Sequence, residues 1–178
     1  MIREFEFFHG PVFARMLHAT KNPLSIEPYH SSSNASYILN GKIGLYIKHS
    51  TKRMTPWRFS FATEHQEEIA EMKGKLDNVF LILVCNDDGI VCLSYEELKQ
   101  ILDENYAPTE WVSVSRNPRQ MYTVKGSDGS LKFKIGANEF PTKLFSTTRI
   151  PIKTGIFDWL QTSKKDNESK EKESESVF

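Results

Sequence analysis

Basic and aromatic residues are concentrated between Glu27 and Glu64. This span contains five lysines and arginines and no acidic residue, a net charge of +5 with histidine neutral. Basic side chains neutralise phosphates, and exposed rings such as Tyr46 and Trp57 can stack on bases. We therefore predict that a basic-aromatic hairpin and loop binds nucleic acid or another phosphate-bearing ligand. The expected binding residues are Lys42, Lys48, Lys52, Arg53, Trp57 and Arg58.

A second basic stretch lies between Trp111 and Lys134. It contains Arg116, Arg119, Lys125, Lys132 and Lys134 against the single acid Asp128. If both stretches share one face, they form one anion-binding surface. The alternative is an ordinary solvated face, balanced by the acidic residues of positions 64–71. The whole chain has 23 basic and 23 acidic residues, so its overall charge indicates no partner.

Standard catalytic motifs are absent from the sequence, which has no GxGxxG, GxxxxGK[ST], GxSxG or HExxH. Asn86-Asp87-Asp88-Gly89 could hold a cation at the end of a strand, but its composition is typical of a turn, which we favour. We predict no metal site. Cys85 and Cys92 lie in apolar runs and are expected to be buried, reduced thiols. His65 lies on the apolar face of a predicted helix, so we interpret it as a boundary histidine rather than a ligand.

Hydrophobic periodicity and end signals predict three helices. The first helix is expected to begin with Pro11 in its first turn. The second begins at Thr63, which forms a capping box with Gln66, and the third covers residues 95–102 behind a capping box of Ser94 and Glu97.

Strands are predicted around these helices. Asn40-Gly41 between two apolar runs predicts a hairpin. Val79–Cys85 is apolar throughout, as in a central strand covered on both faces. The other expected strands are 24–29 at a sheet edge, 35–39, 43–49, 57–61, 90–93, 111–115, 121–125 and 131–135. The predicted fold class is α/β (or α+β), with a mixed central β-sheet and flanking helices.

The predicted organisation is one globular domain over residues 1–162 and a disordered, mixed-charge tail over 163–178. No apolar run approaches the roughly 20 residues of a membrane span. The N-terminal segment has acids at positions 4 and 6 and no apolar core of a signal peptide. We therefore expect a cytoplasmic protein without membrane association. The sequence leaves the oligomeric state open.

The predicted order of elements over roughly residues 10–93 resembles the αβββαβ core of the restriction-endonuclease-like, or PD-(D/E)XK, nucleases. That family carries an acid-x-lysine on one strand. Here Lys48 matches the lysine, and Tyr46 stands in the acid position. The resemblance implies a nuclease-like domain, either catalytically degenerate or active. In an active enzyme, Lys48 and a displaced acid such as Glu27 would work with a magnesium ion that generates the attacking hydroxide.

Two functions stay open beside nucleic-acid binding. One is the active magnesium-dependent nuclease, and no cofactor is expected otherwise. The other is a protein-interaction or regulatory module of a defence or mobile-element locus, with Tyr46, Trp57 and Phe80 as interface anchors. The segment from Tyr46 to Phe61 also resembles small uncharacterised bacterial proteins, a likeness that implies no activity. The salt dependence of binding distinguishes nucleic-acid binding from a protein interface. Phosphate binding weakens steeply as the salt concentration rises, whereas a hydrophobic interface changes little.

Overall fold

The computed structural model describes residues 1–29 and 33–146 of the chain. These residues belong to one compact unit that begins at Met1 and ends at Thr147. The predicted tail at 163–178 and the predicted domain boundary after residue 162 lie outside the described residues.

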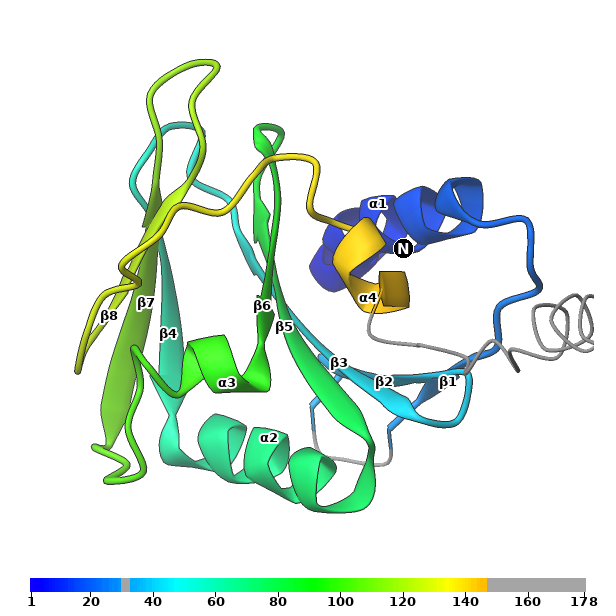
Figure 1. Cartoon of the computed structure of the whole chain (residues 1–178), viewed down its shortest axis with the longest axis horizontal. Coiled ribbons are helices and arrows are strands. Elements are labelled where there is room, and N and C mark those ends of the chain that lie inside the picture. The colour runs from blue at the N-terminus through cyan, green and yellow to red at the C-terminus, as the bar shows by residue number, and fades with distance from the viewer. Residues whose placement is uncertain (30–32, 147–178) are drawn as a thin grey trace, which may run out of the picture. The chain divides into compact units, whose positions relative to one another are not determined.

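Two β-sheets and four helices build this unit, which confirms the predicted mixed α/β class (Figure 1). The larger sheet has the strand order β1-β2-β3-β5-β6, and the smaller one has the order β4-β7-β8. β3 and β5 are parallel, whereas the other paired strands are antiparallel. The strands are β1 (Ile26–Pro28), β2 (Ser36–Leu39), β3 (Ile43–Ser50), β4 (Trp57–Ala62), β5 (Asn78–Cys85), β6 (Gly89–Ser94), β7 (Thr109–Ser115) and β8 (Thr123–Gly126). The helices are α1 (Glu4–Ala19), α2 (Thr63–Lys75), α3 (Tyr95–Leu98) and α4 (Thr142–Ser146).

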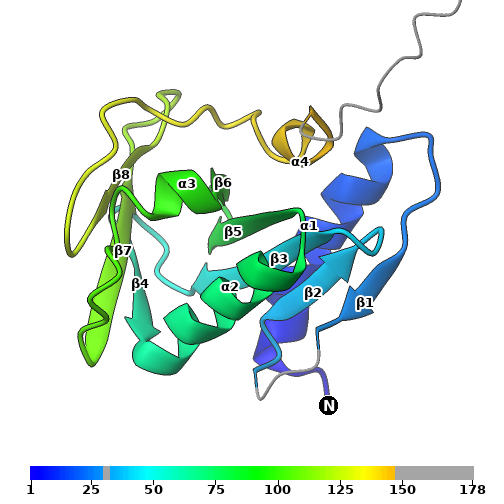
Figure 2. The same cartoon turned by 60° about the horizontal axis from the view of Figure 1, so that its bottom comes forward.

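The helices cover both faces of the larger sheet. Figure 2 shows α1 and α2 on its opposite faces. Ile69 of α2 and Leu98 of α3 pack into a hydrophobic cluster that fills the space between the two sheets. Met16 of α1 and Leu144 of α4 pack into a second cluster on the other face of the larger sheet.

β5 divides its side chains between these two clusters. Leu81 and Leu83 contribute to the cluster between the sheets, and Phe80 and Ile82 contribute to the other. Alternate residues of a strand point to opposite faces, so an apolar run covered on both sides must be apolar throughout. The prediction of a central strand is confirmed.

The hairpin predicted at Asn40-Gly41 is also confirmed. Asn40 and Gly41 have φ values of 53° and 69°, the left-handed region that these two residue types tolerate best. The Asn40 Oδ1 atom accepts a hydrogen bond from the Ser25 backbone N–H at 2.9 Å. This contact holds the start of β1 beside the hairpin. β1 is the edge strand of the larger sheet, as Pro28 predicts.

Two predictions about helix starts are not met. α1 begins at Glu4 and contains Pro11, so the prediction of a first turn at Pro11 is wrong. Glu6 accepts a hydrogen bond from the Arg3 backbone N–H at 2.6 Å and so caps the helix earlier. The predicted capping box of Thr63 and Gln66 is also wrong, because Gln66 is buried and donates to Glu110 instead.

The third helix is confirmed at its start and wrong at its end. Ser94 and Glu97 form the predicted reciprocal bonds, with N–O distances of 2.8 and 3.2 Å. The helix stops at Leu98, and turns follow it. The strand predicted over 131–135 is reduced to one isolated bridge, that of Ile135 with Tyr122.

The restriction-endonuclease-like order is not confirmed. β4 contains the predicted strand 57–61, but it leaves the larger sheet and pairs with β7 in the smaller one. Among the described residues, no helix is long and apolar enough to cross a membrane.

Candidate nucleic-acid interface

The aromatic residues predicted to contact a ligand are buried. Tyr46 is 0% exposed, and Trp57 and Phe80 are each 2% exposed. Trp57 lies on the inner face of β4, and its Nε1 donates to the Lys52 carbonyl oxygen at 2.9 Å. The stacking role predicted for Tyr46 and Trp57 is therefore wrong, and so is the anchor role predicted for these two and Phe80. The alternation along β4 was correctly predicted, but it does not show which face meets the second sheet.

The charged residues of the first basic stretch separate into three places. Lys48 and Arg58 line one pocket, Lys52 and Arg53 are exposed on the loop after β3, and Lys42 lies before β3 begins. Lys42 is thus at the opposite end of β3 from Lys52 and Arg53. The structure does not gather all of the predicted binding residues into one site.

Glu27 is also distant from Lys48. Glu27 pairs with Ile38, which pairs with Gly44. Lys48 is four residues further along β3, about 13 Å, and two strand spacings of about 4.8 Å away. Glu27 accepts instead from the Ser25 hydroxyl at 3.0 Å. This geometry gives no support to the proposed catalytic pair.

Two loops that carry basic residues lie side by side at one end of the sheets. The loop of residues 51–56 follows β3, and the loop of residues 116–121 connects β7 with β8 (Figure 1). The Arg116 backbone N–H donates to Thr55 Oγ1 at 3.3 Å. Thr55 and Arg116 also line one hollow of about 340 Å³ together with Lys134. We call this surface the basic end and define it by Lys52, Arg53, Arg119 and Lys134.

The four cations of the basic end are available for a ligand. All four are exposed, and none forms an ion pair within the described part of the chain. Arg116 has a different role, because its Nε lies 2.8 Å from Asp88 Oδ2 and its guanidinium stacks on the Tyr122 ring at 4.4 Å. The Tyr122 hydroxyl donates to the same carboxylate. Asp88 therefore serves the turn between β5 and β6 and orders the neighbouring loop, as the turn interpretation predicts.

The pocket beside the basic end has a volume of about 340 Å³ and a positive lining. β2 stops pairing with β3 at Tyr46, whereas β5 continues to pair as far as Ser50. The pocket contains residues from this end of β3, from α1, from β4 and from the start of α2. Its titratable lining residues are Lys48, Arg58, His9, His49, His65 and Tyr46, and no carboxylate belongs to the lining that the structure describes.

Lys48 is held at the junction of the two sheets. Its Nζ donates to the Ser60 carbonyl oxygen at 2.6 Å and lies 3.2 Å from His65 Nδ1. An ammonium group has three N–H donors, so one remains for a ligand. Burial lowers the pKa of Lys48 to about 8, while the nearby Glu68 carboxylate opposes this shift. The group stays mainly protonated at neutral pH.

His65 is neutral with its proton on Nε2. The Ala62 backbone N–H can only donate, and it lies 3.1 Å from His65 Nδ1, which must therefore accept. Burial lowers the pKa of His65, and the Lys48 charge lowers it further. The boundary interpretation of His65 fits this satisfied Nδ1. The structure adds a donor, Nε2–H, that has no hydrogen-bond partner among the described residues, and His65 lines the pocket.

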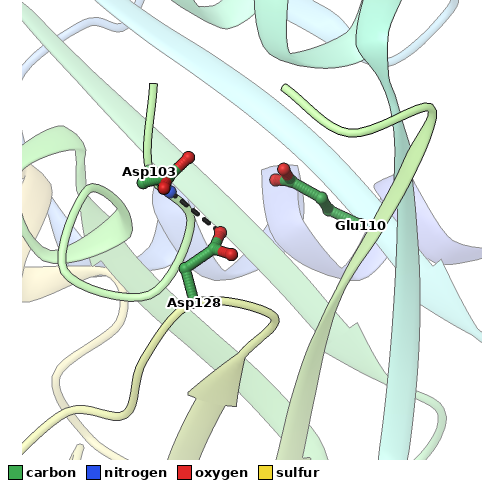
Figure 3. A group of neighbouring side chains, drawn as sticks. All are labelled: Asp103, Glu110 and Asp128. Atoms are coloured by element: carbon green, nitrogen blue, oxygen red, sulfur yellow. Dashed lines mark hydrogen bonds between the residues drawn. The ribbon is translucent and has the colours of Figure 1, made fainter. Parts of the chain in front are cut away.

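Three acidic residues also lie close together, near the other end of β7 (Figure 3). Carboxylate oxygens of Asp103, Glu110 and Asp128 lie within 4.8 Å of one another. Asp128 accepts from the Asp103 backbone N–H at 3.0 Å, and Glu110 accepts from Gln66 at 2.7 Å. These contacts explain the cluster as local support for the loops, and we assign no metal to it. The sequence did not indicate the cluster, because its members are separated along the chain.

Comparisons with known proteins provide no identity for the chain. No family model, no curated protein and no solved structure matches it. Function is therefore inferred from the basic end and the adjoining pocket alone.

Proposed function

We propose that this protein binds nucleic acid through the phosphate backbone, with the basic end as the contact surface. One observation carries the proposal: the loops 51–56 and 116–121 pack together through Thr55 and Arg116. Two basic stretches that are distant in sequence thereby form one positive surface. Phosphate contacts of this kind provide most of the affinity in non-specific nucleic-acid binding.

The chemistry of the surface favours binding without base recognition. Tyr46 and Trp57 are buried, so base stacking on them does not contribute. Lys52 and Arg53 lie on a loop whose shape is held by the bond between Trp57 and the Lys52 carbonyl. Because the backbone of this exposed loop is already fixed, the loop loses little conformational entropy when its cations bind a flexible polyanion. We expect weak dependence on sequence and strong dependence on salt.

Fluorescence anisotropy with labelled single- and double-stranded DNA and RNA tests the proposal. The full-length chain is expected to bind at low salt, and the variant Lys52→Glu/Arg53→Glu is expected to bind much more weakly. The matched control is Lys21→Glu/Lys42→Glu, which reverses two exposed charges outside the basic end. Absence of binding at low salt, or an equal loss in the control, would contradict the proposal.

Nuclease activity and a cytoplasmic location are secondary proposals. Magnesium-dependent degradation of a plasmid that is lost in Lys48→Ala would support the nuclease. Retained degradation in that variant would exclude Lys48 from the reaction. The free, buried thiols of Cys85 and Cys92 are in keeping with a reducing compartment.

A further inference from the structure

We propose that the pocket lined by Lys48, Arg58, His65 and His9 binds a phosphomonoester group, either the phosphorylated end of a nucleic-acid chain or a free nucleotide. For a nucleic-acid chain as the ligand, this inference rests on the proposed function. The lining residues His49 and Arg58 lie just before and just after the loop of residues 51–56 in the sequence. It goes further by naming the chemical group that the pocket takes.

Lys48 and Arg58 of the pocket keep N–H donors that are not taken up by the described residues. One N–H of Lys48 remains after its bonds to Ser60 and His65. The Arg58 guanidinium stacks on the Trp111 ring at 4.4 Å and forms no hydrogen bond within the described residues. The stacking holds the plane of the guanidinium while its N–H groups stay free for bidentate contact with phosphate oxygens.

A buried orphan nitrogen provides independent evidence for a ligand. His9 is 2% exposed, and its Nδ1 lies 2.9 Å from the Tyr37 hydroxyl. Its Nε2 has no hydrogen-bond partner among the described residues. Unsatisfied buried polar atoms are uncommon and point to a missing partner. The Tyr37 hydroxyl donates to the Asn34 carbonyl oxygen at 3.2 Å, so His9 Nδ1 donates to Tyr37 and Nε2 is left as an acceptor. Because His9 lines the pocket, the P–OH of a singly protonated phosphomonoester can supply the missing donor.

The size and charge of the pocket favour a terminal phosphate over the middle of a chain. Its volume of about 340 Å³ is near the lower limit for small-molecule sites. The two cations Lys48 and Arg58 suit a phosphomonoester, which carries a charge of about −1.5 to −2 near neutral pH and can keep one proton on an oxygen. A phosphodiester has a single charge, and both of its ester oxygens carry bulky groups.

The test compares oligonucleotides that differ only at their ends. Short single strands of one sequence would carry a 5′-phosphate, a 3′-phosphate or no terminal phosphate, with the label at the other end or on an internal base. We expect about tenfold or tighter binding for one phosphorylated form, as for a charge-assisted hydrogen-bonded contact. The preference should disappear in Arg58→Gln and in Lys48→Met, and it should persist in Lys42→Gln.

Competition and thermal unfolding distinguish the possible results. A nucleoside monophosphate that displaces the phosphorylated strand supports the pocket for free nucleotides too. Equal binding of all strands, with no displacement by the nucleotide or by inorganic phosphate, overturns the inference while the proposed function stands. If no strand binds, the proposed function fails. In that case, a rise in Tm on adding the nucleoside monophosphate, lost in Arg58→Gln, still supports phosphate binding in the pocket. Absence of any rise in Tm refutes phosphate binding there. The Arg58 variant keeps the test informative if Lys48→Met does not fold.

Discussion

The salt dependence of nucleic-acid binding tests the basic end most directly. Each cation that neutralises a phosphate releases counterions from the polyanion, and for single strands the slope of log K against log salt is about −0.7 per contact. Lys52, Arg53, Arg119 and Lys134 are the four exposed cations without an ion pair in the described residues of this surface. Four contacts give a slope of about −2.8, so affinity falls about 50-fold between 50 and 200 mM salt.

The variant Lys52→Gln/Arg53→Gln removes two of these contacts without adding repulsive charge. We expect its slope to fall to about −1.4, which is a loss of about sevenfold over the same salt range. The control Lys21→Gln/Lys42→Gln removes two exposed cations elsewhere and should retain the original slope. Arg116 is left unchanged because its pair with Asp88 orders the loop.

Anisotropy titrations at several salt concentrations, with one single-stranded oligonucleotide, provide these slopes. Circular dichroism of each variant checks that the fold is intact. Equal slopes for the wild-type chain and Lys52→Gln/Arg53→Gln would refute the reasoning, because Lys52 and Arg53 would then not neutralise phosphates. A reduced slope in the control variant would show that charge acts over the whole surface rather than at the basic end.

Three further predictions concern stability, measured by urea denaturation. Trp57→Ala should lower the free energy of unfolding by about 3–5 kcal/mol, since it removes a buried ring; an effect near zero would contradict the burial of Trp57. Gly126→Ala should cost about 1–3 kcal/mol, because its Cβ would lie 2.0 Å from the Ile101 carbonyl oxygen; unchanged stability would show that the backbone relaxes. Burial, and then the nearby His49, lowers the pKa of His9 from 6.5 to about 4. The unfolded chain therefore binds the proton at a higher pH than the folded chain does. The free energy of unfolding should fall by up to about 3 kcal/mol as the pH drops from 6.5 to about 4. His9→Gln should remove this part of the pH dependence, whereas the exposed His18→Gln should keep it.

Local patterns in the sequence determined several elements of this protein. The β5 strand follows from an unbroken apolar run, the hairpin from Asn40-Gly41, and the start of α3 from Ser94 and Glu97. In each case the signal acts within a few residues, through backbone conformation, a capping bond or alternation of side chains. The mixed α/β class follows from the sum of such signals.

Helix ends and weak strands were less predictable. α1 starts before Pro11, and the predicted partner of Thr63 is taken by Glu110. The segment 131–135 alternates correctly for a strand but forms a single isolated bridge, at Ile135. α1 starts earlier through a local contact of Arg3 with Glu6, outside the range predicted for the helix. Gln66 and the segment 131–135 depend instead on tertiary contacts, and the sequence does not show which of the competing contacts is stronger.

Only the tertiary structure decided what the basic-aromatic segment presents to solvent. Alternation along β4 shows that Trp57 and Phe59 share a face, but that face is buried because a second sheet covers it. The pocket likewise depends on α1, β3, β4 and α2 meeting where β2 begins, so the contributions of His9 and His65 could not be predicted from spacing. The basic end exists because Thr55 and Arg116, 61 residues apart, are brought into contact. Sequence patterns determine which side chains point together within an element, whereas the packing of the elements decides which of them remain exposed to a ligand.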